Sequence, residues 1–375
     1  MSHAHGRRMI ALGGPPDNNG VYVNSHIPAA ARIHDAIIIG GGPAGLACAK
    51  GLGRLEHSVI VFDDNRYDAQ NAAVMHQAHG FDSTSAEAFR DEISDAITEE
   101  HETVRLVQYR VTEARNLGPG RGSHGDFPTR FTVMATDGKQ YWCRKLIIAT
   151  GTMHEMYQLP NYKRLWGKHI HNNLLFQGFE KRGLQESVGI LAMGGRLGGP
   201  SVQNQERVAA LARSAARLAD YVTIYTDGDE GHAAGIRARL HRNGPYRLVT
   251  RPIVYMGEGV GSTNANPYVT VKVATGEERD ETFLVHDPVP ILESPVIAMS
   301  LRLQVTRNNL IHAPMVHYQS TVAGVYAIGD CADPLTTGIS NACAMGNCAA
   351  EGISHALLAE DEAIDDLYGD DHMSE

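Results

Sequence analysis

The chain has 375 residues, of which 43% are hydrophobic and 20% are charged, and its formal net charge is −10 at pH 7. This length suits one large or two medium-sized domains with an ample core. The negative charge argues against nucleic acid and anionic membranes as partners. Because no apolar run approaches the ~18 residues that a membrane helix requires, the sequence predicts a globular protein.

The N-terminal segment and the cysteines predict the compartment. Residues 1–32 are rich in Gly, Pro and Asn and contain no long apolar stretch, so we expect a flexible arm and no signal peptide. The five cysteines show neither a C-x-x-C pair nor zinc spacing. They indicate buried free thiols in a reducing compartment, which predicts a cytoplasmic protein, and no residue is assigned to a metal.

Residues 36–63 have the pattern of a strand, a glycine turn, a helix and a second strand that ends in an acid. In this G-x-G-x-x-G motif the first glycine permits a tight turn, the second lets the backbone approach a pyrophosphate, and the third lets the helix lie close to the sheet. The helix N-terminus directs its N–H groups at the phosphates, and the acid accepts from a ribose 2′-OH. The predicted dinucleotide contacts are Gly40, Gly42, Pro43, Ala44, Gly45 and Asp63.

Further elements follow from apolar periodicity and from turn residues. In order, we expect a helix at 86–98, an antiparallel strand layer at 104–142, a strand ending at Gly151, a second βαβ pattern at 187–226, short strands at 252–285, a strand at 324–330 and a helix at 340–358. The acidic tail, 361–375, is expected to be a solvated end.

The order of these landmarks resembles that of the low-molecular-weight thioredoxin reductases, over roughly residues 33–358. The resemblance implies an α/β fold of two Rossmann-like dinucleotide-binding domains, with the second inserted into the first, and a homodimer. The implied domains are an FAD-binding part at 33–158, a degenerate NAD(P)-type insert at 159–292 and a second FAD-binding part at 293–375.

The resemblance also implies FAD contacts. In that family the A-T-G strand end and the G-x-x-A-x-G-D strand line FAD, and the acid of the latter bonds the ribityl chain. The helix that follows would direct its N-terminal dipole at the flavin N1–C2=O edge, where reduced flavin is anionic. A segment after Asp63 is similar to that of the gliotoxin-type dithiol oxidases. The additional expected contacts are Asn71, His76, Ala149, Thr150, Gly151, Gly329, Asp330, Gly338 and Ile339.

The first departure from the family concerns the redox cysteines. The C-x-x-C pair should fall at Asn173 and Phe176, and its acid at Gln177. An amide and a phenyl ring cannot form a disulfide or a thiolate, and the Gln177 amide does not titrate. We therefore expect no dithiol–disulfide exchange.

The second departure concerns the nicotinamide site. Depending on where the second glycine turn begins, Arg196 or Leu197 stands at the position that must approach a pyrophosphate. The strand after the helix ends with Asp227, whose carboxylate would repel a 2′-phosphate. Only a loop that folded back could supply compensating cations from Arg237, Arg239 and Arg242.

Without dithiol exchange and without a functional nicotinamide site, the simplest complete reaction cycle is that of an FAD-dependent oxidase. A small organic substrate, expected to be a secondary metabolite, would give a hydride to flavin N5, and O2 would reoxidise the flavin and yield H2O2. The substrate's O–H or N–H proton needs a base, and histidine titrates near neutrality. We expect His171 or His76 to be that base, with Asn173 and Gln177 orienting the substrate.

Two alternatives stay open. One is an NAD(P)H-dependent flavoprotein reductase similar to the ferredoxin-NADP-reductase-like branch, which also lacks the cysteine pair. The other is a non-catalytic FAD-containing scaffold or partner protein. Reduction of the flavin by a nicotinamide would favour the first, and failure to react with any substrate would favour the second.

Overall fold

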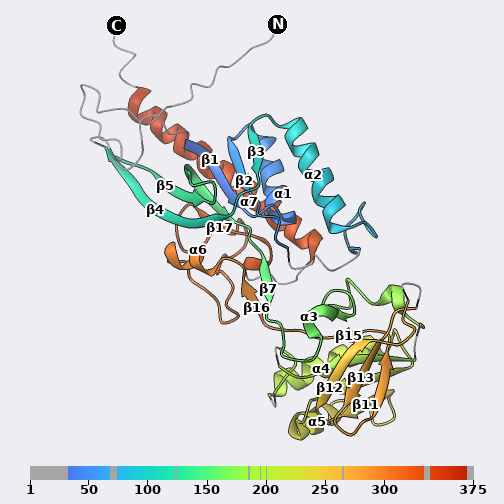
Figure 1. Cartoon of the computed structure of the whole chain (residues 1–375). Helices are drawn as coiled ribbons and strands as arrows, with labels where there is room; N and C mark the ends of the chain where they lie inside the picture. Colours follow the sequence, from blue (N-terminus) through green and yellow to red (C-terminus); the bar gives the residue numbers. More distant parts are fainter. Residues whose placement is uncertain are drawn as a thin grey trace, which may run out of the picture. The chain divides into compact units, whose positions relative to one another are not determined.

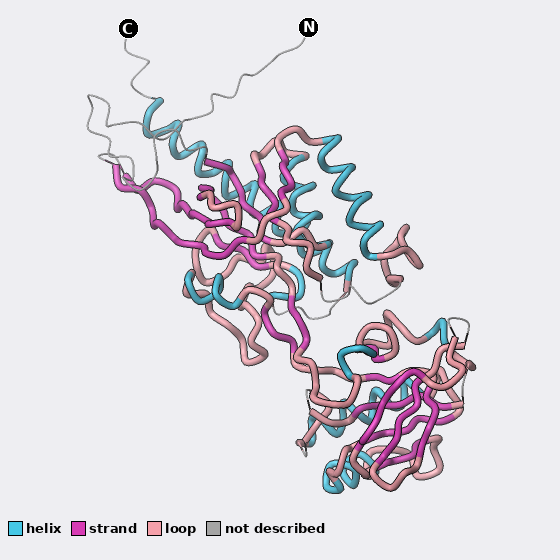
Figure 2. Tube along the Cα trace, in the orientation of Figure 1, coloured by secondary structure: helices cyan, strands magenta, loops and turns pink. Residues whose placement is uncertain are grey.

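A computed structural model describes residues 33–67, 74–122, 125–184, 186–194, 196–199, 201–263, 266–332 and 338–369 (Figures 1 and 2). The expected N-terminal arm and Asn71 lie outside the described residues. The chain divides into two compact units. The first contains the chain up to Arg66, Arg90–Thr152 and the chain from Leu292, and the second contains Tyr67–Phe89 and Met153–Ile291. The domain boundaries expected at 158 and 292 stay a prediction.

The first unit is built on a seven-stranded sheet in the order β3-β2-β1-β6-β5-β4, with β17 also paired to β6. The first half of β6 pairs antiparallel with β5, and its second half pairs parallel with β17. The strands are β1 (Ile33–Ile39), β2 (Val59–Phe62), β3 (Val104–Val107), β4 (Val111–Gly122), β5 (Gly125–Ala135), β6 (Gln140–Ile148) and β17 (Val325–Ala327).

Continuous apolar runs explain the central strands. Ile37 and Ile38 are fully buried, as expected for a parallel strand covered on both faces. The expected antiparallel layer at 104–142 is only partly correct, because β3 pairs parallel with β2 through the register Val59↔Val104. The helix α2 (Ala86–Glu100) lies between β2 and β3 in the chain and makes the crossover that a parallel pair requires.

Two helices of the first unit pack closely through small residues. The helix α1 (Pro43–Gly53) lies beside α7 (Ile339–Gly369), which Figure 1 shows in red. A Cβ added at Gly346 would lie 2.3 Å from the Ala44 carbonyl oxygen, and one at Gly51 would lie 2.7 Å from the Ala350 Cβ. The close packing therefore holds the N-terminal end of α1 in place.

The start of the acidic tail is not a free solvated end, contrary to expectation. The helix α7 continues to Gly369. Near its C-terminal end, Glu360 and Asp361 form ion pairs with Arg144 at 3.1 and 2.8 Å. These two carboxylates are therefore bound to an arginine of β6. The run of acids in the sequence did not indicate this contact.

The second unit has a parallel sheet in the order β11-β10-β9-β15-β8 and an antiparallel sheet, β12-β13-β14. These strands are β8 (Ile170–His171), β9 (Ser187–Leu191), β10 (Tyr221–Tyr225), β11 (Tyr246–Val249), β12 (Ile253–Glu258), β13 (Val269–Val273), β14 (Glu278–Glu281) and β15 (Leu284–Val285). Its helices are α3 (Tyr162–Leu165), α4 (Val202–Ala215), α5 (Glu230–Arg237) and the short η2 (Phe179–Lys181).

Two of the four points where the chain passes from one unit to the other lie in short strands, β7 (Thr152–His154) and β16 (Pro290–Leu292), which pair with each other. The first unit also contains α6 (Pro295–Ser300) and the 3-10 turn η3 (Gly329–Cys331). None of the described helices combines the length and the apolarity needed to cross a bilayer.

Candidate functional site

The first glycine turn is as tight as the motif requires. Gly40 has φ of +115°, and a Cβ added there would lie 2.2 Å from the Ala149 carbonyl oxygen. A Cβ at Gly45 would lie 2.0 Å from the Gly40 carbonyl oxygen. Both positions therefore exclude any larger residue, and the turn lies directly against the end of β6.

Gly42 differs from its neighbours because the space beside it is open. A Cβ added there would meet no heavy atom of the described residues within 4 Å. Gly42 is the N-cap of α1, Pro43 follows it, and no side chain caps the helix end. Uncapped N–H groups beside open space can bind a phosphate, so this turn fits the pyrophosphate of a dinucleotide.

Asp63 lies at the same end of the sheet. A Cβ added at Gly41 would lie 2.5 Å from Asp63 Oδ2, so the carboxylate lies against the glycine turn. Its Oδ1 accepts a hydrogen bond of 3.0 Å from the Asn65 N–H. This placement suits an acid that accepts from a ribose hydroxyl.

The other expected FAD contacts of the first unit lie near the turn. The Ala149 N–H donates to the Ile39 carbonyl at 2.8 Å, which places the A-T-G segment beside the end of β1. A Cβ on Gly329 would lie 3.0 Å from the Ala44 Cβ, which brings η3 and Asp330 to the start of α1. The Cys331 Sγ donates to the Ile148 carbonyl at 3.3 Å. Gly338, with φ of +123°, directly precedes α7, whose first residue is Ile339.

The second glycine turn, in the second unit, is filled by an aromatic ring. A Cβ on Gly194 would lie 2.2 Å from the Tyr157 ring. Burial raises the pKa of the Tyr157 hydroxyl, and the negative charge of Asp227, which follows β10, raises it further. Tyr157 therefore occupies the space beside the glycine turn, where a βαβ unit would hold part of a nucleotide.

The polar groups around this second turn have protein partners. The Arg196 N–H donates to the Asp287 carbonyl at 2.8 Å, and Asp227 Oδ1 accepts from the Ile253 N–H at 2.7 Å. Arg237 donates to the Tyr246 carbonyl and Arg239 to the Gly235 carbonyl. The two arginines thus bind the backbone around α5 and β11.

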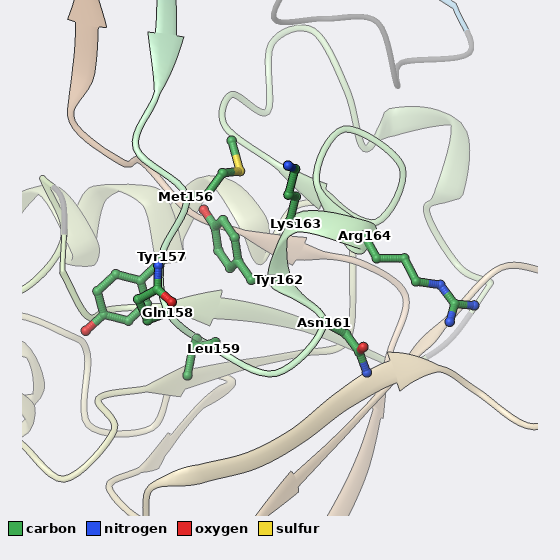
Figure 3. Close-up of a pocket in the computed structure, with 8 residues that line it drawn as sticks. All are labelled: Met156, Tyr157, Gln158, Leu159, Asn161, Tyr162, Lys163 and Arg164. Atoms are coloured by element: carbon green, nitrogen blue, oxygen red, sulfur yellow. The ribbon is translucent and has the colours of Figure 1, made fainter.

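A cavity of about 680 Å³ adjoins Tyr157 and is lined by residues 156–159 and 161–164. Figure 3 shows these lining residues, with the Lys163 and Arg164 side chains extending in different directions. The Tyr162 hydroxyl bonds His286 Nδ1 at 2.5 Å, and His286 Nε2 lies 2.8 Å from the Met193 carbonyl. Because a carbonyl only accepts, His286 carries its proton on Nε2 and accepts from Tyr162.

The expected base His171 is buried in the second unit, with 3% of its surface exposed. Its Nε2 lies 3.2 Å from Lys181 Nζ. Burial and the Lys181 charge lower the pKa of His171 to about 3, although a hydrogen bond with Gln177 opposes this shift. His171 is therefore neutral at physiological pH.

The other expected catalytic residues, His76, Asn173 and Gln177, also belong to the second unit. His76 Nε2 is 3.2 Å from Glu180 Oε1, so a carboxylate of η2 orients this histidine. Asn173 Oδ1 accepts from the Leu175 N–H at 2.9 Å, which closes a turn at the position of the missing sulfurs. Sequence reasoning missed Glu180 and Lys181 as partners of the two histidines, because only the 3-10 turn brings both side chains to them.

The described cysteines do not form a redox centre. Cys48, Cys143 and Cys331 are buried free thiols, and burial raises the pKa of Cys48 to about 12. Cys343 and Cys348 are free and half-buried. Within the described ranges, no group of three or more His, Cys, Asp or Glu residues is arranged to hold a metal ion.

Comparison with known proteins places the chain among its relatives. Residues 34–191 match the pyridine nucleotide-disulphide oxidoreductase family. The chain is 32% identical over 337 residues to thioredoxin reductase aclD of Aspergillus oryzae, a match that covers 89% of this chain and 99% of that protein. It is 30% identical to thioredoxin reductase tcpT of Claviceps purpurea, with 88% and 97% covered. This chain belongs to the thioredoxin-reductase-like oxidoreductases.

Solved structures confirm the expected fold of this thioredoxin-reductase-like protein. An oxidoreductase from Agrobacterium tumefaciens matches with a TM-score of 0.70 and 22% identity, over 87% of this chain and 99% of that one. The crystal structure of HlmI matches with a TM-score of 0.72 and 19% identity, over 89% and 96%. Family membership also makes the protein an FAD-dependent oxidoreductase.

Proposed function

We propose that this thioredoxin-reductase-like protein is an FAD-dependent oxidase of a small organic substrate, expected to be a secondary metabolite, and performs no dithiol exchange. The observation that carries this proposal is the turn at 173–177. Asn173 and Phe176 stand where the family has its redox cysteines, and the Asn173 amide is engaged with the Leu175 N–H. Without sulfurs, a thiol pathway through this segment has no chemical basis.

The residues of the first unit are proposed to hold FAD. Gly42 and the uncapped start of α1 would face the pyrophosphate, Asp63 the ribose, and Asp330 the ribityl chain. Bound FAD would accept two electrons from the substrate and transfer them to O2, which yields H2O2. Asn71, which lies outside the described residues, and His76 stay proposed contacts.

The residues of the second unit are proposed to serve the substrate. His171 is neutral, and His76 is paired with Glu180, so either can take part in removing a proton. Asn173, whose Oδ1 accepts from the Leu175 N–H, and Gln177 of the same turn are proposed to orient the substrate. We also propose that the protein is a cytoplasmic homodimer, which light scattering and localisation of a tagged chain would test.

An anaerobic experiment tests the oxidase proposal against a nicotinamide-dependent reductase. The purified yellow protein is mixed with NADH or with NADPH without O2, and flavin absorbance is followed. We expect slow or no bleaching by either nucleotide, because Tyr157 fills the second glycine turn and Asp227 opposes a 2′-phosphate. Rapid bleaching would contradict the oxidase proposal, whereas bleaching by a candidate metabolite followed by H2O2 formation in air would support it.

A further inference from the structure

The cavity beside Tyr157 lies wholly in the second unit. Its volume of about 680 Å³ is within the range of pockets that hold small organic molecules. One part of its lining is apolar and consists of Met156, Tyr157 and Leu159, which are half-buried and pack against the buried cluster that contains Tyr162 and Trp166. This part of the cavity can therefore hold an apolar group of a ligand at the edge of the core.

The remaining lining is polar and cationic. It contains Gln158, Asn161, Lys163 and Arg164, and no carboxylate is among the described lining residues. The whole chain carries a formal net charge of −10, so two neighbouring cations without an acid in the lining reverse the sign of the charge locally. Such a position favours the anionic group of a ligand.

The backbone that carries these cations is fixed by its neighbours. Asn161 has φ of +61° as the N-cap of α3, and its Nδ2 donates to the Met256 carbonyl at 2.7 Å. The next residue, Tyr162, bonds His286 through its hydroxyl, and its ring stacks on Trp166 with the centroids 5.7 Å apart. Because this turn is already held in place, a ligand does not have to order it on binding.

Lys163 is the cation that remains available to a ligand. The Lys163 and Arg164 side chains extend in different directions (Figure 3). A hydrogen bond from Lys168 lowers the pKa of Glu258, and the positive charge of Arg164 lowers it further, so this carboxylate offsets part of the Arg164 charge. Lys163, by contrast, is exposed, and its ammonium forms no ion pair or hydrogen bond within the part of the chain that the structure describes.

We propose that this cavity binds a small organic carboxylate, with the Lys163 ammonium on the carboxylate group and Met156, Tyr157 and Leu159 against a ring-sized apolar body. An ammonium donates up to three hydrogen bonds, and hydrogen bonds between charged groups are stronger than those between neutral groups. The site belongs to the second unit alone. The inference therefore goes beyond the oxidase proposal and stands or falls without it.

A tryptophan of the second unit reports on this cavity. Trp166 stacks on Tyr162, which lines the cavity, and the sequence contains one other tryptophan, Trp142, in β6 of the first unit. In a Trp142→Phe holoprotein, Trp166 emission is followed during titration with benzoate, phenylacetate and 3-phenylpropionate and with the amide of each acid. Calorimetric titration of the same protein detects binding that leaves the emission unchanged. We expect at least one acid to bind saturably and about five- to tenfold more tightly than its amide, because only the acid pairs with Lys163.

Matched variants that each remove one charge assign the carboxylate to Lys163. Lys163→Met should make the acid bind as weakly as its amide, whereas the affinity for the amide should not change, since the amide does not use the charge. Arg164→Met should weaken binding of the acid less than about threefold, because Glu258 already offsets part of the Arg164 charge. Arg242→Met, which removes an exposed cation of the same unit outside the cavity lining, should leave both affinities unchanged.

Several results would overturn the inference. They are the absence of saturable binding of all three acids by both measurements, equal affinities for acid and amide in the Trp142→Phe protein, and a preference for the acid that survives in Lys163→Met. The melting temperature of Lys163→Met should match that of its parent, because Lys163 is exposed. Added NaCl should weaken binding of the acid and not of its amide, since salt screens an exposed ion pair. Binding of the acid that does not respond to salt would also contradict the role of Lys163.

Discussion

At the first glycine turn, Gly42 and Gly45 offer a matched pair of substitutions. A Cβ at Gly42 would meet open space and φ there is −77°, whereas a Cβ at Gly45 would lie 2.0 Å from a carbonyl oxygen. Gly42→Ala should therefore leave the melting temperature of the apoprotein unchanged and weaken FAD binding about tenfold, because the methyl group occupies the phosphate position. Gly45→Ala should destabilise the apoprotein by roughly 1–3 kcal/mol.

Thermal unfolding of the two apoproteins and a flavin titration check this pair. A Gly42→Ala variant that binds FAD as tightly as wild type would place the pyrophosphate elsewhere. A Gly45→Ala variant as stable as wild type would show that the start of α1 can move away from the turn.

Asp330 allows a second test at this scale. Asp330 follows β17 in η3, beside the start of α1. If its carboxylate bonds the ribityl chain, Asp330→Ala should lower the FAD occupancy of the purified protein several-fold, as read from the ratio of flavin to protein absorbance. Asp330→Asn, which keeps an acceptor, should lose less. A fully flavinated Asp330→Ala protein would contradict the proposed contact.

Single residues also show where sequence reasoning stopped. The need for glycine in the first turn could be predicted because the motif requires close backbone contacts. At Gly40 and Gly45 a side chain would collide with a carbonyl oxygen. The 3.2 Å contact between Lys181 Nζ and His171 Nε2, ten residues apart in the chain, could not be predicted from the sequence. No periodic pattern encodes such a contact, since η2 is a single short turn.

Among the elements, β1, β6 and α7 are joined by an ionic network around Asp35. Burial alone would raise the pKa of this carboxyl. The His57 imidazole, whose Nδ1 lies 3.9 Å away, the hydrogen bond from the Ser58 N–H and the charge of Arg144 lower the pKa from 3.8 to about 2. Arg144 also binds Glu360 and Asp361 of α7. The network thus couples the C-terminal end of α7 to the sheet.

This network predicts a pH dependence of stability. Because the folded-state pKa of Asp35 is below its unfolded value, its contribution is complete above pH ~4 and is lost as the pH falls toward 2, by about 2 kcal/mol. Urea unfolding at pH 2 to 5 should show this loss in wild type and a flatter profile in Asp35→Asn. Asp95→Asn, at an exposed position of α2, serves as the control. Equal slopes in wild type and Asp35→Asn would exclude the network as the cause.

Elements were predictable where local pattern and tertiary pairing agree. The strands β9 and β10 and the helix between them follow the expected βαβ order, because a buried apolar run and a 3.6-residue period need no further information. The direction of β3 was not predictable, since a four-residue strand pairs in either sense and its partner decides. The ion pairs of Glu360 and Asp361 depend on Arg144, which is distant in the sequence.

In the whole molecule, the chain distributes the proposed tasks between the two units. The glycine turn, Asp63, the A-T-G segment and Asp330 belong to the first unit, although they come from segments far apart in the sequence. The turn at 173–177, His76 and His171 belong to the second. The resemblance predicted the order of these segments, but pairing His76 with Glu180 required the grouping of Tyr67–Phe89 with the second unit.

This division predicts how FAD changes hydrogen exchange. FAD added to the apoprotein at 100 times its Kd stabilises the part that binds it by about 2.7 kcal/mol, which slows exchange through full opening of that part up to roughly 100-fold. Because the proposed contacts lie in the first unit, the slowing should occur in β1, β17 and the first turns of α7, with β9 and β10 unchanged. Mass spectrometry of peptides from both units measures this difference. Gly42→Ala at the same FAD concentration is the control, in which the slowing should fall to roughly 10-fold because its Kd is about tenfold higher. Equal protection of β9 and β10 would contradict this prediction. FAD titration of a Gly194→Ala variant would then decide between a cofactor bound at the second glycine turn, which would reject the assignment of FAD to the first unit alone, and cooperative unfolding of the two units.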